Sequence, residues 1–213
     1  GYMGDHEEGS YGPYQQSHRA DIYKVCIKWL IEQGRAYPCF CSSESLDKIR
    51  SIQEANKLIP GYYGQFAKCR FLTNDERAEK IKNGEPFVIR FKSNGNHIKK
   101  IKVHDLIRGD FEIAQNDQDI VIFKSDGLPT YHFAHCVDDH FMRTTTVTRG
   151  EEWIASLPIH VELFEAMNWK APLYAHLPVI MKIGEEGNKR KLSKRLDSEA
   201  AVSYFLEDGY PTE

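Results

Sequence analysis

The chain has 213 residues, of which 41% are hydrophobic and 28% are charged, a balance that excludes an intrinsically disordered protein. No stretch approaches the roughly 20 apolar residues of a transmembrane helix, so we expect no membrane partner. The net charge of −3 excludes a uniformly basic nucleic-acid-binding protein and leaves any such contact to local basic patches.

Two amphipathic helices are predicted near the start of the chain. The first begins at Ser17, a good N-cap residue, and stops at Gly34. The second begins near Ser43 and carries an apolar residue at every third position. We assign residues 1–36 to the first part of a parallel-sheet domain.

An inserted α+β region is predicted for residues 37–115. A short helix is expected over 75–83, and Asn94-Gly95 separates two strand-like runs. Asn-Gly in that setting is a strong hairpin signal, so the flanking strands should pair with each other. The strands expected in this small sheet are 87–91, 98–103 and 106–113.

A parallel sheet is predicted for residues 116–182. Unbroken apolar runs are typical of strands buried on both faces, and they alternate here with helical patterns over 131–142 and 159–169. This alternation predicts an α/β fold. The strands expected in it are 120–123, 144–148 and 177–181. We assign 183–213 to a C-terminal region that begins with a basic loop.

Candidate functional residues follow the strand ends, where open parallel sheets bind their ligands. The second strand ends at Arg149-Gly150-Glu151-Glu152, and the third leads into a loop with five basic residues between 189 and 195. Such a loop can neutralise a polyphosphate. A solvated charged loop explains the same residues if only their charge is considered.

The same loop carries a motif. Residues 191–195, KLSKR, resemble the KMSKS signature of class I aminoacyl-tRNA synthetases. Four other segments resemble glutamyl-tRNA synthetases, in the right order and with sensible spacing. They are YGPYQQS at 11–17, GLPTYHFA at 127–134, VDDH at 137–140 and RGEEW at 149–153. The resemblance implies a Rossmann catalytic domain that is split by an inserted acceptor-stem-binding domain.

The resemblance also implies a reaction in two steps that serves protein synthesis. Glutamate and ATP, with Mg²⁺, would form glutamyl-adenylate and diphosphate, and the acceptor stem of tRNA(Glu) would then receive the glutamyl group. Such catalysis is mostly positioning and charge stabilisation. We expect a cytoplasmic enzyme that is monomeric at full length.

Site residues follow from the matched motifs. Lys194 and Lys191 would be the catalytic residues that stabilise the phosphates, and Lys194, Glu152 and Trp153 would bind ATP. The glutamate-binding residues would be Tyr131, His135 and Arg149. An arginine fork suits a carboxylate better than a lysine does.

His135 departs from the family pattern, which often has asparagine there. Histidine can still donate or accept a hydrogen bond, but its protonation state then matters for the recognition of glutamate.

The cysteines suggest a metal site. An odd total of five, without a visible secretory signal, argues against a disulfide framework. Cys39, Cys41 and Cys69 could bind zinc, and the resemblance implies Tyr62 as the fourth ligand. Three buried thiols are the alternative. Cys26 and Cys136 lie within predicted helices and should be inert core thiols.

Three other functions fit some of the residues. A paralogue that glutamylates a modified base of tRNA(Asp) shares much of the resemblance, although the long Cys41-to-Cys69 spacing and the KLSKR form favour the full synthetase. A metal-dependent hydrolase could use His132, His135 and neighbouring acids. A non-catalytic RNA-binding module is suggested by the basic residues on 90–108.

No HIGH-type motif, the partner of KMSKS in class I enzymes, occurs in the sequence. We therefore expect a fragment of the catalytic domain, without the HIGH segment and without the anticodon-binding domain. Such a chain should not activate glutamate on its own, because nothing would orient the α-phosphate against the carboxylate.

Overall fold

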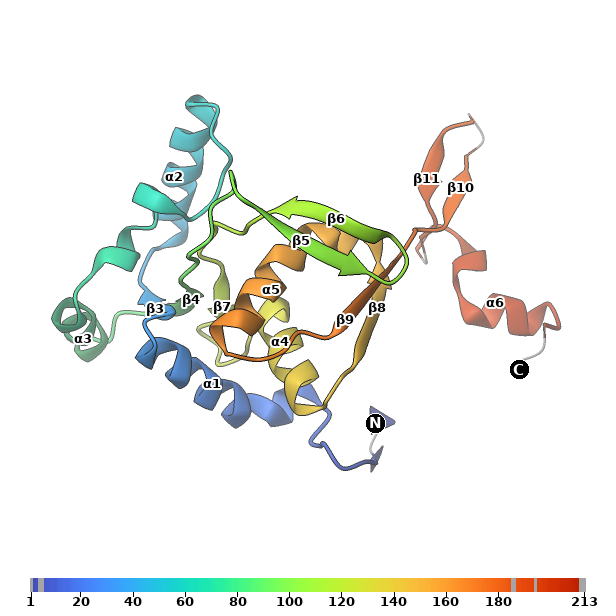
Figure 1. Cartoon of the computed structure of the whole chain (residues 1–213), viewed down its shortest axis with the longest axis horizontal. Helices are drawn as coiled ribbons and strands as arrows, with labels where there is room; N and C mark the ends of the chain where they lie inside the picture. The colour runs from blue at the N-terminus through green and yellow to red at the C-terminus, as the bar shows by residue number, and fades with distance from the viewer. Residues whose placement is uncertain (1, 4–5, 185–186, 194, 211–213) are drawn as a thin grey trace.

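The structure is a computed structural model that describes residues 2–3, 6–184, 187–193 and 195–210 (Figure 1). Two short strands, β1 (Tyr2–Met3) and β2 (His6–Glu7), pair at the N-terminus. A 3-10 turn then leads into α1 (Ala20–Glu32), which confirms the first predicted helix with a slightly later start. Among the described residues, no helix combines the length and the apolar character that crossing a membrane requires.

A three-stranded antiparallel sheet follows α1. Its order is β3 (Ala36–Cys39), β4 (Val88–Phe91) and β7 (Val121–Phe123). The helices α2 (Ser43–Ala55) and α3 (Asn74–Lys82) lie between β3 and β4 in the chain and confirm the two helices predicted there. Both are capped as their sequences suggest, since Ser42 and Thr73 accept backbone hydrogen bonds at the N-termini.

The pairing of β7 corrects one prediction. We expected 120–123 in the parallel sheet, but β7 runs antiparallel to β4. An apolar run indicates that a strand is buried and does not indicate its neighbour, which explains the error.

The hairpin predicted at Asn94-Gly95 is also wrong. β4 stays in the three-stranded sheet, whereas β5 (Lys100–Asp105) pairs with β6 (Gly109–Ala114). Gly95 has a different role, because a Cβ there would lie 1.9 Å from the Asn116 carbonyl oxygen. Glycine at this position permits a close approach of two backbone segments rather than a turn.

A four-stranded mixed sheet has the order β6-β5-β9-β8. The strands β8 (Thr146–Gly150) and β9 (Leu173–Leu177) are parallel, and β5 joins β9 in parallel as well. The third strand thus ends where 177–181 was predicted to begin. A buried histidine, His176, interrupts the apolar pattern of β9, so the pattern did not predict a strand over these residues.

Two helices complete this half, α4 (Tyr131–Phe141) and α5 (Leu157–Ala166), as predicted within a few residues. They pack against each other, and α4 also contacts α1. One buried cluster combines residues of α1, β3, β4, β7, α4 and α5. The α/β class with a parallel-containing sheet is confirmed, while the strand pairs β4–β7 and β5–β9 cross the predicted domain boundaries. The division into domains stays a prediction.

The last described segments extend away from the rest in Figure 1. They are a hairpin of β10 (Met181–Ile183) and β11 (Lys189–Lys191), followed by α6 (Val202–Glu207). The first two residues of the KLSKR motif therefore lie at the end of a strand and just after it.

Candidate functional site

Arg149 lies at the carboxyl end of β8, where the parallel sheet should bind a ligand. Its guanidinium donates from Nε to His176 Nε2 at 2.9 Å and from Nη1 to His160 Nδ1 at 3.1 Å. A weaker contact joins Nη2 to the Trp153 carbonyl at 3.4 Å, and the Tyr174 ring centroid lies 4.8 Å from the guanidinium carbon. The guanidinium is thus held by two imidazoles and a backbone carbonyl.

His176 in turn bonds to a buried carboxylate. Its Nδ1 lies 2.6 Å from Asp105 Oδ2, and both side chains are fully buried. Burial raises the pKa of Asp105, but the His176 side chain and the backbone N–H groups of Arg108, Ile107 and His176 outweigh it and lower the pKa to about 2. The residue at the end of β5 is therefore an anion.

His160 lies on the other side of Arg149, on the buried face of α5. Burial, followed by the charges of His135 and Arg149, lowers the pKa of His160 to about 2, so its ring is neutral. His160 Nε2 lies 3.0 Å from His132 Nδ1 on α4. A hydrogen-bonded chain thus runs from the sheet to the first turn of α4.

Aromatic rings surround this chain. Tyr131, at the start of α4, is 46% exposed and stacks on His135 with the rings 13° from parallel. The Trp153 ring centroid lies 4.6 Å from that of Tyr131. His135 Nε2 lies 3.2 Å from the Tyr174 hydroxyl, and its Nδ1 lies 2.8 Å from Asp139. The structure therefore brings all three predicted glutamate-binding residues, and Trp153, to one place.

The predicted ATP residues lie beside it. Lys191, at the end of β11, pairs with Glu152, just past β8, and the lysine lowers the pKa of that carboxylate. This contact joins the KLSKR segment to the end of the parallel strand. Lys194 lies outside the described residues.

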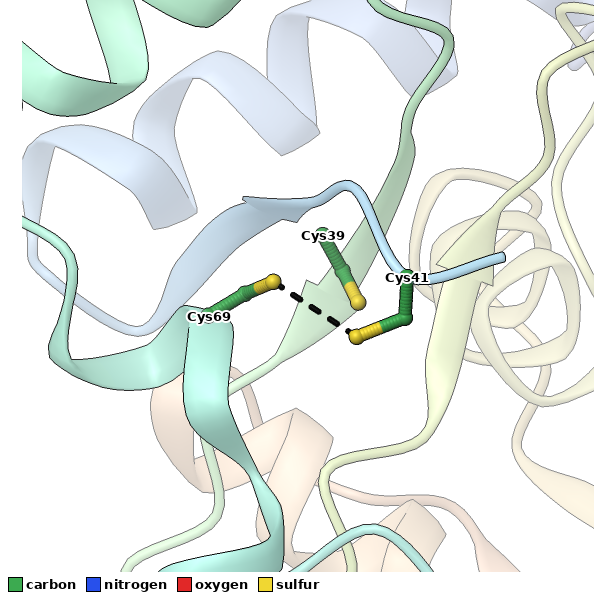
Figure 2. Close-up of side chains that lie close together, drawn as sticks. All are labelled: Cys39, Cys41 and Cys69. Carbon is green, nitrogen blue, oxygen red and sulfur yellow. Dashed lines mark hydrogen bonds between the residues drawn. The ribbon is translucent and has the colours of Figure 1, made fainter. Parts of the chain in front are cut away.

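A second cluster lies at the three-stranded sheet (Figure 2). Cys39 ends β3, Cys41 follows two residues later, and Cys69 comes from a 3-10 turn between α2 and α3. Their sulfur atoms lie within 4.8 Å of one another. In the part of the chain that the structure describes, this is the only such group of three His, Cys, Asp or Glu side chains, so the histidines of α4 do not form a metal cluster there.

Tyr62 completes this cluster. Its hydroxyl lies 3.2 Å from Cys41 Sγ and 3.5 Å from Cys39 Sγ, and it accepts the backbone N–H of Cys69. A tetrahedral zinc ion with Zn–S bonds of about 2.3 Å holds its sulfur ligands about 3.8 Å apart. The Cys41 and Cys69 sulfurs, 3.7 Å apart, already have that spacing.

The cluster can also supply a thiolate. A hydrogen bond from Cys69, opposed by burial and aided by Tyr62, lowers the pKa of Cys39 to about 4. The thiols of Cys26 and Cys136 differ, since burial raises the pKa of both, to about 11 for Cys26. Both are buried core thiols, as predicted. Three soft donors and one oxygen fit a zinc ion.

Sequence reasoning missed Asp105, His176 and His160. Asp105 lay inside a predicted turn region, and the two histidines lay among apolar residues. A polar residue within an otherwise apolar run was the one available signal, because such a residue needs a partner once it is buried.

The fold and the site together define a class I aminoacyl-tRNA synthetase catalytic domain. Residues 2–213 match the family described as "tRNA synthetases class I (E and Q), catalytic domain", and the chain belongs to this family. The resemblance noted from the motifs is therefore confirmed.

Individual relatives agree. The chain is 57% identical to a glutamate–tRNA ligase of Clostridium beijerinckii over 96% of its own length and 37% of that protein, and 55% identical to one of Clostridium perfringens over 97% and 38%. A solved glutamate tRNA ligase of Elizabethkingia meningosepticum, in complex with its amino acid, superposes with a TM-score of 0.78 at 39% identity. That match covers 95% of this chain and 39% of the solved one. The chain thus spans well under half the length of these relatives.

Proposed function

We propose that this chain supplies the catalytic site of a glutamate–tRNA ligase. The enzyme joins glutamate to tRNA(Glu) in two steps, through glutamyl-adenylate formed from ATP. One observation carries the proposal: within a family that acts on glutamate or glutamine, a guanidinium stands at the end of a parallel strand and is held by imidazole and carbonyl groups. Among the described residues no carboxylate forms an ion pair with this guanidinium, so an acidic substrate can do so.

Arg149 binds the side-chain carboxylate of glutamate in this proposal. Guanidinium and carboxylate pair through two parallel hydrogen bonds, which selects a carboxylate over the amide of glutamine. Tyr131 and His135 form the adjacent wall through their stacked rings. The proximity of these residues supports the assignment.

ATP binds beside them. Trp153 offers a ring face next to the end of β8, and Lys191 and Lys194 supply positive charge for the phosphates, which enter with Mg²⁺. Glu152 holds Lys191 until the nucleotide arrives. The lysines stabilise charge that develops at the α-phosphate as the glutamate carboxylate attacks.

Zinc is held by Cys39, Cys41, Cys69 and Tyr62. The ion would join β3 to the turn before α3, and so stabilise the region to which we assign the tRNA acceptor stem. It takes no part in the transfer of glutamate.

The enzyme works in the cytoplasm, is monomeric at full length, and divides as 1–36, 37–115, 116–182 and 183–213. The 213 residues alone do not activate glutamate, because no HIGH-type motif is present.

The test is glutamate-dependent exchange between ATP and diphosphate in the presence of tRNA(Glu). A full-length ligase that carries this chain should show exchange with glutamate and not with glutamine, and Lys194→Ala should abolish it. Exchange that is unaffected by Lys194→Ala would contradict the proposed site. Exchange by the 213-residue chain above its own Lys194→Ala control would contradict the statement that the chain alone is inactive.

A further inference from the structure

The donor and the acceptor can be assigned for each hydrogen bond between Arg149, His176 and Asp105. Arg149 Nε carries a proton at every accessible pH, so it is the donor toward His176 Nε2. That nitrogen must then be an unprotonated acceptor. The proton of a neutral His176 ring therefore lies on Nδ1, which faces Asp105.

Asp105 is placed to enforce this choice. Its Oδ2 accepts the Nδ1 proton of His176, while its Oδ1 accepts the backbone N–H groups of Ile107 and Arg108 at 3.0 Å each. The carboxylate has no proton to offer, so only the Nδ1–H form of His176 satisfies it. A carboxylate at one end of the imidazole thus makes the other end an acceptor.

Arg149 gains a fixed orientation from two imidazoles that come from different elements. His176 holds Nε and His160 holds Nη1, from a strand and a helix respectively. With the weak bond to the Trp153 carbonyl, three of the five N–H groups of the guanidinium have partners in the structure. The two that remain are the number that a bidentate carboxylate requires.

We propose that Asp105 and His176 are positioning residues for glutamate: the carboxylate fixes the tautomer of His176, and His176 holds Arg149 in the orientation that receives the substrate carboxylate. This inference rests on the proposed role of Arg149. Neither residue touches the substrate, and both act through the guanidinium. An arginine that rotated freely would have to be ordered when glutamate binds, and this ordering would cost binding free energy.

The decisive variant is Asp105→Asn. Its amide oxygen can still accept the backbone N–H groups, but its NH₂ now donates toward His176 Nδ1. The proton of the ring must then move to Nε2. The Nε2–H and the Nε–H of Arg149 then face each other as two donors, and their hydrogen bond is lost. We expect the KM for glutamate to rise at least about tenfold in a full-length ligase that carries this chain, with the KM for ATP within about twofold.

A matched control lies on β5 and its other neighbour, β6. His104 and Asp110 form a second histidine–aspartate pair at 2.6 Å, but both are exposed to solvent. Asp110→Asn removes the same kind of contact without reaching Arg149. Both KM values should stay within about twofold of the unmodified enzyme.

A second pair of variants keeps the proposal falsifiable if Asp105→Asn does not fold. His176→Gln leaves an oxygen near the Nε2 position that can accept from Arg149, whereas His176→Asn leaves only a donor toward Asp105. We expect His176→Gln to retain a lower KM for glutamate than His176→Asn. The reverse order, or equal KM values, would overturn the inference.

A spectroscopic arm observes the tautomer itself. ¹⁵N NMR of labelled histidine side chains at neutral pH should show His176 protonated at Nδ1, and at Nε2 in Asp105→Asn. A signal for Nε2–H in the unmodified protein, or equal losses for glutamate and ATP in Asp105→Asn, would overturn the inference. If Arg149→Lys impairs glutamate use while Asp105→Asn does not, the inference about Asp105 and His176 is wrong and the proposed function stands. If Arg149→Lys has no effect on glutamate, the proposed function fails.

Discussion

The thiol cluster and the arginine site are assembled in opposite ways. Cys39 and Cys41 are two residues apart, and the whole cluster comes from one short stretch of chain. Arg149 is held by residues of three other elements, and His176 bonds to Asp105, 71 residues away. The first arrangement is local, whereas the second depends on residues of β8, β9 and β5 that are far apart in the chain.

The largest effect is expected from breaking the local cluster. Cys69→Ser should reduce bound zinc from about one ion per chain to none, and lower the free energy of unfolding by more than about 4 kcal/mol, because loss of a structural metal is among the costliest changes. Elemental analysis and chemical denaturation check this. Cys26→Ser, a buried thiol outside the cluster, is the control and should keep its metal. Unmodified protein that holds no zinc when purified without chelator would contradict it.

The next effect concerns the arginine site. Arg149→Lys should lower kcat/KM for glutamate by about 2–4 kcal/mol in free energy, since a point charge replaces a planar fork and two imidazoles lose their donor. kcat/KM for ATP should change far less. Lys124→Arg, at an exposed pair with Asp126, is a control for arginine–lysine exchange and should change neither value. Equal losses for both substrates would make Arg149 structural.

A smaller effect is expected from the ionisation of Asp105, which acts on the arginine site and not on the thiol cluster. The pKa of Asp105 is lowered to about 2 from an ordinary value of 3.8, so its ionised form stabilises the folded state above pH 3.8. This contribution is lost as the pH falls from about 4 toward 2. The midpoint of thermal unfolding of the unmodified protein should therefore approach that of Asp105→Asn as the pH falls through that window. A difference that stays constant down to pH 2 would show that folding does not lower the pKa of this carboxyl group.

The smallest effect is expected at the surface. Glu152→Gln removes the pair with Lys191, which is exposed to solvent, so the midpoint of thermal unfolding should not change measurably. The affinity for ATP is the informative measurement, because Lys191 is then released. A marked loss of stability would mean that this contact holds the β10–β11 hairpin in place.

Features that depend on neighbouring residues could be predicted from the sequence. Helices with N-caps and an apolar face appeared within a few residues of their expected ends, and the Cys-x-Cys pair identified the neighbourhood of the thiol cluster. Motifs of the family located Arg149 and Tyr131. The predicted strand partners were wrong at β7, because an apolar run does not indicate which strand lies beside it. They were also wrong at Asn94-Gly95, because the glycine serves a close approach of two backbone segments and not a turn.

Asp105 and His176 could not have been predicted for a related reason. His176 is a lone polar residue in an apolar strand, whereas Asp105 is one of several polar residues of β5. The pairing of the two becomes visible only when β5 and β9 are neighbours. A buried charge needs a partner, but the rule does not say which residue of the chain provides it. Pairing between distant strands is the information that local patterns lack.

The 71-residue separation of Asp105 and His176 has a consequence during synthesis on the ribosome. The β5–β6 hairpin is local and can close as soon as it emerges, but the carboxylate at its end has no imidazole until β9 has left the exit tunnel. All residues of the thiol cluster therefore emerge before the last residue that holds Arg149. A ribosome that stalls between these two points leaves a chain that has its thiol-cluster residues but in which Asp105 still lacks His176 and Arg149 lacks its partner on β9.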